Sequence, residues 1–397
     1  MTMSGEKQGV FGLVPGRLAF LVLIGLTLAI YVAFVTVAAL NTHNRIGLGG
    51  APLFYDFSVF HQAGILAIAG NAADAYDDGR MIAAQHAAFP GSTLRLPWNY
   101  PPTFQLMLMP FGALPYVAAW LAWSCLLYGC YALLVRRLVA DPRHISFLLL
   151  SPGIAVNLFF GQNGVLSVIL MGGGVLLLRS RPILSGILLG ILAYKPQLAV
   201  LAPLVLICGR EWRALAAAVV SQGTLVGLSI AVMGVAPWIG FLHKVTHPAT
   251  VLSSSSDWRA VPSIMTFAGT IGADVHASAV IHWSIAVLAA GVAMWTWWKT
   301  KDALSRLGIL ATATLLVTPY LRAYDLALMV LSIAALLARA QPTILEKAII
   351  FAAWLLPAYL MFVPPQIQFG PLVTAAMLIT LVWCAFSKRS TPQIVSG

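Results

Sequence analysis

Long apolar segments alternate with short polar or proline-containing turns along most of the chain. Runs of this kind are typical of transmembrane helices, because a helix satisfies its own backbone hydrogen bonds inside lipid. The pattern predicts an all-α polytopic membrane protein, with one integral domain over residues 1–397 and about twelve crossings. The apolar segments lie at about 18–40, 103–135, 145–160, 164–178, 183–194, 197–208, 214–234, 277–298, 304–318, 326–339, 343–363 and 371–386.

The third to sixth predicted crossings are unusually short, and several have fewer than the roughly 20 residues that a full crossing needs. Such segments tilt, extend beyond the predicted boundaries or enclose a cavity. The turns Gly161-Gln162-Asn163 and Lys195-Pro196-Gln197 are predicted on one side of the membrane, together with two long polar segments at about 41–99 and 235–276. Within the first of these, residues 57–70 have the pattern of a helix lying on the membrane surface.

The basic residues sort this topology into two sides. Of 23 Lys and Arg, sixteen fall at one set of turns and seven at the other, so the sixteen mark the cytoplasmic side and place both termini there. The cytoplasmic set also holds five acids, and sixteen minus five equals the whole net charge of +11. This excess would face anionic inner-leaflet lipid and does not indicate nucleic-acid binding. The extracytoplasmic bases are Arg45, Arg80, Arg95, Lys195, Lys244, Arg259 and Arg322.

The composition agrees with a membrane protein, since 60% of residues are hydrophobic and only 9% are charged, against about 25% in soluble domains. The four cysteines lie in apolar stretches and have neither zinc-site spacing nor the pattern of a disulfide framework. No cofactor is predicted. Asp74, Asp77 and Asp78 either bind a divalent metal or belong to a solvated loop.

Asp56 is the candidate with the most specific setting, because it opens the predicted helix in the first extracytoplasmic segment. It either caps that helix or acts as a catalytic carboxylate, and the two roles are compatible. His61, one and a half turns later, either faces the same cavity or is an interfacial histidine.

Lys195 lies between two short apolar segments and directly before a proline. A cation at membrane depth is costly and usually functional, although a lysine also snorkels to the interface. At the level of Gln162 and Asn163, it would offer a phosphate a cation and amide donors.

Three further patterns provide candidates. Asp257 and Arg259 flank Trp258, and Arg322 and Asp325 flank Tyr324, so each acid–base pair contacts substrate or only shapes a loop. Tyr100 precedes Pro101-Pro102, which by themselves explain a rigid helix start.

The ordered set of motifs resembles glycosyltransferase family 87, the polyprenol-phosphate-mannose-dependent α-mannosyltransferases of the GT-C superfamily. The resemblance covers about residues 18–340. In many members an aromatic residue and a histidine stand where this chain has Tyr320, Arg322 and Tyr324, which assigns a phosphate contact to Arg322. The matching motifs are Asp56-x-x-Val59, Gly70 through Tyr76-Asp77, Tyr100-Pro101-Pro102, Gly161-Gln162-Asn163, Lys195-Pro196 and Thr318-Pro319.

The resemblance implies a GT-C fold and transfer of a sugar, mannose first, from a polyprenyl-phosphate donor to a lipid or glycan hydroxyl. A polyprenyl phosphate leaves as an anion and needs positive charge around it, so one carboxylate is enough where a glycosidase needs two. Asp56 would be the general base of an inverting reaction. The donor phosphate would contact Lys195, Arg322 and Arg259, and the substrates would contact His61, Tyr100, Gln162, Asn163, Asp257 and Tyr324.

Such an enzyme would serve glycolipid biosynthesis in the cell envelope, as a multi-pass protein of the inner (cytoplasmic) membrane with its site facing the periplasm or exterior. Its partners would be the donor, the acceptor and membrane lipid. One competing class is a transporter or flippase for a lipid-linked or polar substrate, although transporters keep their polar residues near the midplane. Another is a structural subunit of an envelope-assembly complex.

Overall fold

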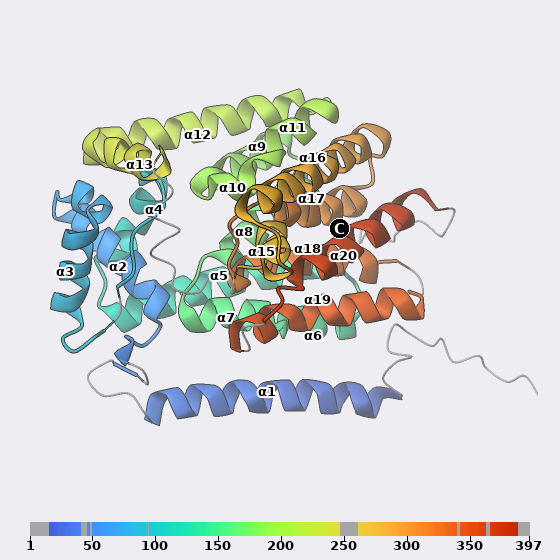
Figure 1. Ribbon diagram of the computed structural model, residues 1–397, viewed down its shortest axis with the longest axis horizontal. Coiled ribbons are helices and arrows are strands. Elements are labelled where there is room, and N and C mark those ends of the chain that lie inside the picture. The colour runs from blue at the N-terminus through green and yellow to red at the C-terminus, as the bar shows by residue number, and fades with distance from the viewer. Residues whose placement is uncertain are drawn as a thin grey trace, which may run out of the picture.

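The computed structural model describes residues 16–40, 46–47, 50–93, 95–246, 261–339, 342–362 and 366–387, and within them the chain is helical with no β-strand. A single isolated bridge joins Ile46 to Pro52. In Figure 1, α12 (Trp212–Met233) lies along the top of the view and α1 (Gly16–Leu40) along the bottom, with α16 (Val275–Lys299) between them. The all-α polytopic prediction is confirmed.

Among the described residues, four helical stretches have the length and composition to cross a membrane: Tyr116–Leu138, Pro142–Phe160, Trp212–Met233 and Val275–Lys299. Shorter apolar helices lie at Gly164–Leu177, Pro182–Tyr194, Pro196–Cys208, Ala303–Val317, Ala323–Leu337 and Gly370–Phe386. The predicted number of crossings, twelve, stays a prediction.

The centre of the bundle is formed by α17 (Ala303–Val317) and α18 (Met329–Leu337), whose residues are buried almost throughout. A helix that is apolar on all sides belongs in such a position. By contrast, α12 exposes two thirds of Val219 and Val220, so its outer surface is suited to lipid contact.

Two predicted helices are each divided in two. The segment 103–135 consists of α4 (Pro102–Gly112) and α5 (Tyr116–Leu138), separated just before Tyr116 by Pro115. The segment 145–160 consists of α6 (Pro142–Leu149) and α7 (Pro152–Phe160). A proline cannot donate the backbone hydrogen bond that would continue a helix, so each break falls at a proline.

The first long polar segment folds into a cap at one end of the bundle, at the left of Figure 1. It contains α2 (Tyr55–Ile68), η3 (Ala72–Tyr76) and α3 (Asp78–Ala88), and α4 and α13 (Ala236–Thr246) lie against it. The helix predicted on the membrane surface is α2; Phe57 and Phe60, expected on its lipid-facing side, are instead buried against protein, whereas Ile68 is 49% exposed.

Glycine contacts fix this cap. A Cβ on Gly64 would lie 2.6 Å from the Leu108 carbonyl oxygen, and a Cβ on Gly112 would lie 2.5 Å from the Gly64 carbonyl carbon. The backbones of α2 and α4 therefore touch directly. Lys244 of α13 adds an ion pair of 2.5 Å with Asp78 of α3.

Two turns that were predicted on the cytoplasmic side are joined by ion pairs away from the cap. Arg306, only 3% exposed, pairs with Glu211 at 2.8 Å, and Lys301 pairs with the same carboxylate at 3.2 Å. Glu211 lies in the α11–α12 connection, where α11 is Leu201–Cys208, Lys301 lies in the α16–α17 connection, and Arg306 lies in the first turn of α17. Their meeting agrees with the prediction that both connections lie on one side of the membrane.

Candidate active site

Polar side chains from separate parts of the chain converge beneath the cap. They come from the first turn of α2, the turn between α7 and α8 (Gly164–Leu177), the break between η4 (Leu192–Tyr194) and α10 (Pro196–Ala199), and the start of η6 (Ala323–Leu328). The converging residues are Asp56, Gln162, Asn163, Lys195, Arg322, Tyr324 and Asp325, with Tyr100 beside them.

A buried ion pair lies at the centre of the site. Lys195 Nζ is 2.5 Å from Asp325 Oδ1 and donates to Asn163 Oδ1 at 2.7 Å. The side chains of Lys195 and Asp325 are 3% and 4% exposed, so the lysine does not snorkel to an interface. Its ammonium also lies 4.9 Å from the Tyr324 ring centre and 5.9 Å from that of Tyr100. The remaining Asp325 oxygen accepts the Arg322 backbone N–H at 3.0 Å.

From the sequence, Asp325 was considered only as the acid beside Arg322, and its pairing with Lys195, which is 130 positions away, was missed. A local view of Arg322-Ala323-Tyr324-Asp325 suggests pairing between its own ends. The structure instead uses the carboxylate to neutralise Lys195.

Asp56 lies inside the first turn of α2, whose N-cap is Phe54, so the helix-capping role predicted for Asp56 is wrong. Burial raises the pKa of its carboxyl to about 6, and the opposing influences are a hydrogen bond from Gln162 and the charges of Arg322 and Lys195. Protein atoms surround the carboxyl closely, yet the residue keeps an intermediate exposed fraction. The Asp56 carboxylate is therefore enclosed by protein, while the residue keeps some solvent exposure.

Gly161 explains how the α7–α8 turn approaches Asp56 so closely. It ends α7 with φ of 70°, a left-handed conformation that favours glycine. A Cβ at this position would clash with Phe57 Cβ, one residue after Asp56. The glycine therefore serves both the turn and its contact with α2, which brings Gln162 to the carboxylate.

Asn157 stabilises the same turn through hydrogen bonds. It was not identified as a site residue from the sequence. Its fully buried side chain donates to the carbonyl oxygens of Gly153 at 2.7 Å and Tyr324 at 2.9 Å, and accepts from the Gly164 N–H at 2.7 Å. A lone asparagine in an apolar segment was the available signal, since buried polar groups must find partners.

Arg322 is the cation of the site that has no carboxylate partner. It is half-buried, its guanidinium lies 5.6 Å from the Tyr320 ring centre, and it forms no ion pair with any residue that the structure describes. Its charge acts on the Asp56 carboxylate. Arg322 is therefore a cation whose charge interacts with Asp56 but is not held in a direct ion pair.

Neutral hydrogen-bond donors complete the site. Burial raises the pKa of the Tyr100 hydroxyl, which therefore stays protonated. Asn163 Nδ2 lies within reach of this hydroxyl but makes no well-formed hydrogen bond. Because Asn163 is fully buried, this N–H is a buried donor that lacks a well-formed partner among the described residues.

The family model of Glycosyltransferase family 87 matches residues 98–319, more than half of the 397-residue chain. The chain belongs to glycosyltransferase family 87. It is thus a membrane glycosyltransferase, as the resemblance of its motifs predicted. No curated protein and no solved structure matches it.

The part of this family 87 chain that matches contains Tyr100, Gln162, Asn163 and Lys195. Asp56 and Arg322 lie outside the matched range, and the fold brings them to the same site.

The remaining predicted site residues are placed elsewhere or lie outside the described residues. His61 Nε2 is 2.9 Å from the Leu114 carbonyl oxygen and its ring packs against Tyr116, so the structure uses it to join α2 to the α4–α5 connection. Asp257 and Arg259 fall in 247–260, outside the described residues.

The acidic loop residues are each accounted for by protein partners. Asp74 pairs with Arg80 at 2.6 Å, Asp77 caps α3, and Asp78 pairs with Lys244. Within the described ranges, no group of three or more His, Cys, Asp and Glu could hold a metal ion.

Proposed function

We propose that this glycosyltransferase moves a sugar, mannose in the first instance, from a polyprenyl-phosphate donor to a lipid or glycan hydroxyl with inversion at the anomeric carbon. One observation carries the proposal. The Asp56 carboxylate, with its raised pKa, lies in a single site with Arg322, Gln162 and Lys195. A base and a phosphate-binding cation are the two functions that the reaction requires.

Asp56 would take the acceptor proton. A pKa of about 6 leaves the carboxyl ionised at neutral pH, while making it a stronger base than an ordinary aspartate. The acceptor oxygen attacks the anomeric carbon, the bond from that carbon to the phosphate oxygen breaks, and the electron pair leaves with the phosphate.

Charge balance in the site suits this step. Lys195 and Arg322 contribute two positive charges, and Asp325 and ionised Asp56 contribute two negative ones. When Asp56 gains the acceptor proton, the sum rises from zero to +1 as the leaving phosphate gains negative charge. The protein would thus stabilise the charge where it develops in the transition state.

Arg322 and Lys195 would contribute differently to phosphate binding. Asp325 already neutralises Lys195, so Arg322 would supply the main attraction and Lys195 would hold Asn163 in position. The free N–H of Asn163 and the Tyr100 hydroxyl would then bind phosphate or sugar oxygens. The side predicted as extracytoplasmic for these turns would put the reaction on the outer face of the inner membrane.

The test uses purified protein, membrane lipid extract as acceptor, and mannose radiolabelled in either of two donors, polyprenyl-phosphate mannose or a nucleotide-activated mannose. The proposal predicts transfer from the polyprenyl donor only, with the product anomer opposite to that of the donor by NMR. Transfer from the nucleotide donor, or retention of configuration, would contradict it. Facilitated movement of the lipid-linked sugar without transfer would favour the flippase alternative.

A further inference from the structure

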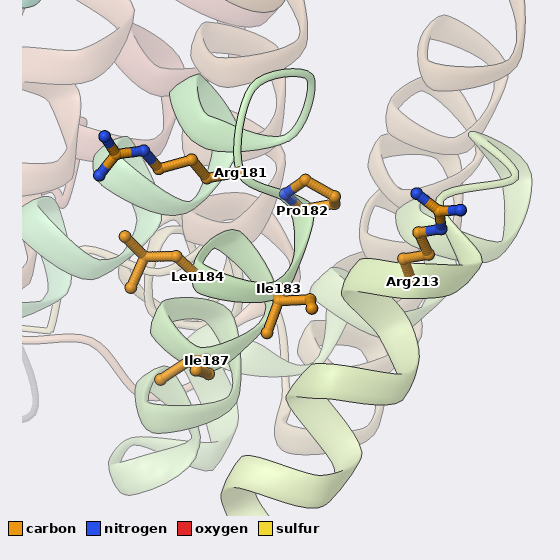
Figure 2. Close-up of a pocket in the computed structure, with 6 residues that line it drawn as sticks. All are labelled: Arg181, Pro182, Ile183, Leu184, Ile187 and Arg213. Carbon is orange, nitrogen blue, oxygen red and sulfur yellow. The ribbon is translucent and has the colours of Figure 1, made fainter.

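A groove on the outside of the bundle lies between α9 (Pro182–Ile191) and the start of α12. Figure 2 shows that the Arg181 guanidinium points away from Arg213, and the rest of the lining is apolar. Nothing in this groove points to a particular ligand. The side chains that act on the candidate active site from outside it lie in the cap instead.

The segment 96–100 connects α3 to α4 and leads to Tyr100 at the candidate site. Pro97 and Pro101 favour an extended backbone here, because the residue before a proline is turned away from the helical conformation. The segment belongs to no helix or strand, so its carbonyl groups need partners other than a regular ladder.

The carbonyl groups at positions 96, 98 and 100 each accept a hydrogen bond from a side chain of a different element of the cap. Gln85 of α3, which is buried, donates to Leu96 O at 2.7 Å. Lys244 of α13 donates to Trp98 O at 3.1 Å while it pairs with Asp78. Alternate residues of an extended chain face the same side, so the cap holds one side of the segment along its length.

The third of these donors is Tyr76, the last residue of η3. Its hydroxyl donates to Tyr100 O at 2.9 Å. Tyr76 is buried and packs edge-on against Phe241 of α13, with ring centres 6.4 Å apart. A Cβ on Gly240 would lie 2.7 Å from Tyr76 Cβ, so α13 touches the base of this side chain directly. The Tyr76 hydroxyl is therefore a donor in a fixed position.

The Tyr100 side chain lies among the polar groups of the candidate site. Its ring centre is 5.9 Å from Lys195 Nζ, and its hydroxyl has Asn163 and Tyr324 within reach. The Tyr100 carbonyl belongs to the same residue as this hydroxyl. A shift of the backbone at Tyr100 would therefore move the hydroxyl relative to Lys195 and Asn163.

We propose that Tyr76 is a positioning residue for sugar transfer, whose hydroxyl fixes the Tyr100 backbone and so the place of the Tyr100 hydroxyl in the site. Tyr76 belongs to a motif of the family resemblance that received no role in the site. This role rests on the proposed function, in which the Tyr100 hydroxyl binds a phosphate or sugar oxygen.

The first measurement does not depend on activity. 3-Fluorotyrosine is placed at position 100 of the purified full chain, and its ¹⁹F NMR signal is recorded with and without Tyr76→Phe. The matched control is Tyr131→Phe, which also removes a buried hydroxyl that donates to a backbone carbonyl, that of Leu148 at 2.6 Å, between α5 and α6.

Tyr76→Phe is expected to broaden or double the ¹⁹F signal, because the ring then takes more than one position, and Tyr131→Phe is expected to leave it single. A single unchanged signal in Tyr76→Phe, or the same broadening in both variants, would overturn the proposal.

The second measurement is kcat/KM for polyprenyl-phosphate mannose. Tyr76→Phe is expected to lower it about fivefold or more, while Tyr131→Phe leaves it unchanged. In a Tyr100→Phe background, Tyr76→Phe should change it less than about twofold, because Tyr76 acts through the Tyr100 hydroxyl. Equal losses in the two backgrounds would overturn the proposal. If wild type transfers no sugar, the proposed function fails, and the ¹⁹F signal still decides whether Tyr76 holds Tyr100 in place.

Discussion

The buried pair of Lys195 and Asp325 permits a quantitative prediction about stability. The substitution Asp325→Asn keeps a side-chain oxygen for the Arg322 N–H but leaves the Lys195 ammonium without its carboxylate. The converse change, Lys195→Met, leaves the carboxylate without its cation.

The size of the effect follows from burial. With side chains only 3% and 4% exposed, water cannot replace the missing partner. Removing one partner of such a pair costs about 3–5 kcal/mol, because an uncompensated charge stays in a low-dielectric interior. The double variant Lys195→Met/Asp325→Asn has neither charge and should be more stable than either single variant.

The assay unfolds the three variants and wild type with heat or SDS in the same detergent. Tryptophan fluorescence monitors the unfolding. The expected order of stability is wild type, then the double variant, then the two single variants. If the two single losses simply add in the double variant, Lys195 and Asp325 are not energetically coupled and the description of the site is wrong.

Three further predictions concern activity. Since Asp56 has a pKa of about 6 and acts ionised, kcat/KM should be constant above that pH and fall about tenfold per unit below it; a flat pH–rate profile from 5 to 7 would contradict this. Arg322→Gln should raise the KM for the donor by about 10- to 100-fold, with partial recovery in Arg322→Lys, whereas unchanged donor kinetics would remove its phosphate role. Gly161→Ala should reduce turnover about tenfold or more, because the added Cβ would push the Gln162 turn away from α2. The control Gly129→Ala should leave turnover unchanged, since no atom lies within 4 Å of its added Cβ. Equal effects of the two substitutions would refute the close contact at Gly161.

The helices were largely predictable, because apolar runs and flanking charge report lipid and water contact directly. Segments such as 164–178 and 277–298 match α8 and α16 closely. The breaks at Pro115 and Pro152 were overlooked because the apolar composition continues through them. The lipid contact predicted for Phe57 and Phe60 of α2 was wrong, because apolar side chains look the same in sequence whether lipid or protein covers them.

The candidate site was predictable only in part. Asp56, Gln162 and Lys195 stand out as polar groups in apolar or membrane-adjacent surroundings. Their partners do not, since the contacts of Asp325 and Asn157 join residues 130 and 167 positions apart. Such contacts depend on how helices pack, which a hydrophobic pattern does not specify.

The most direct measurement compares wild type, Asp56→Asn and Asp74→Asn in single-turnover sugar transfer at saturating polyprenyl-phosphate sugar. Asp74 is the matched control, because it loses the same charge in the same cap but pairs with exposed Arg80. We expect Asp56→Asn to slow transfer by about 100-fold or more, with donor affinity retained and thermal stability not reduced. Asp74→Asn should transfer normally. Near-normal transfer by Asp56→Asn would show that Asp56 is not the general base.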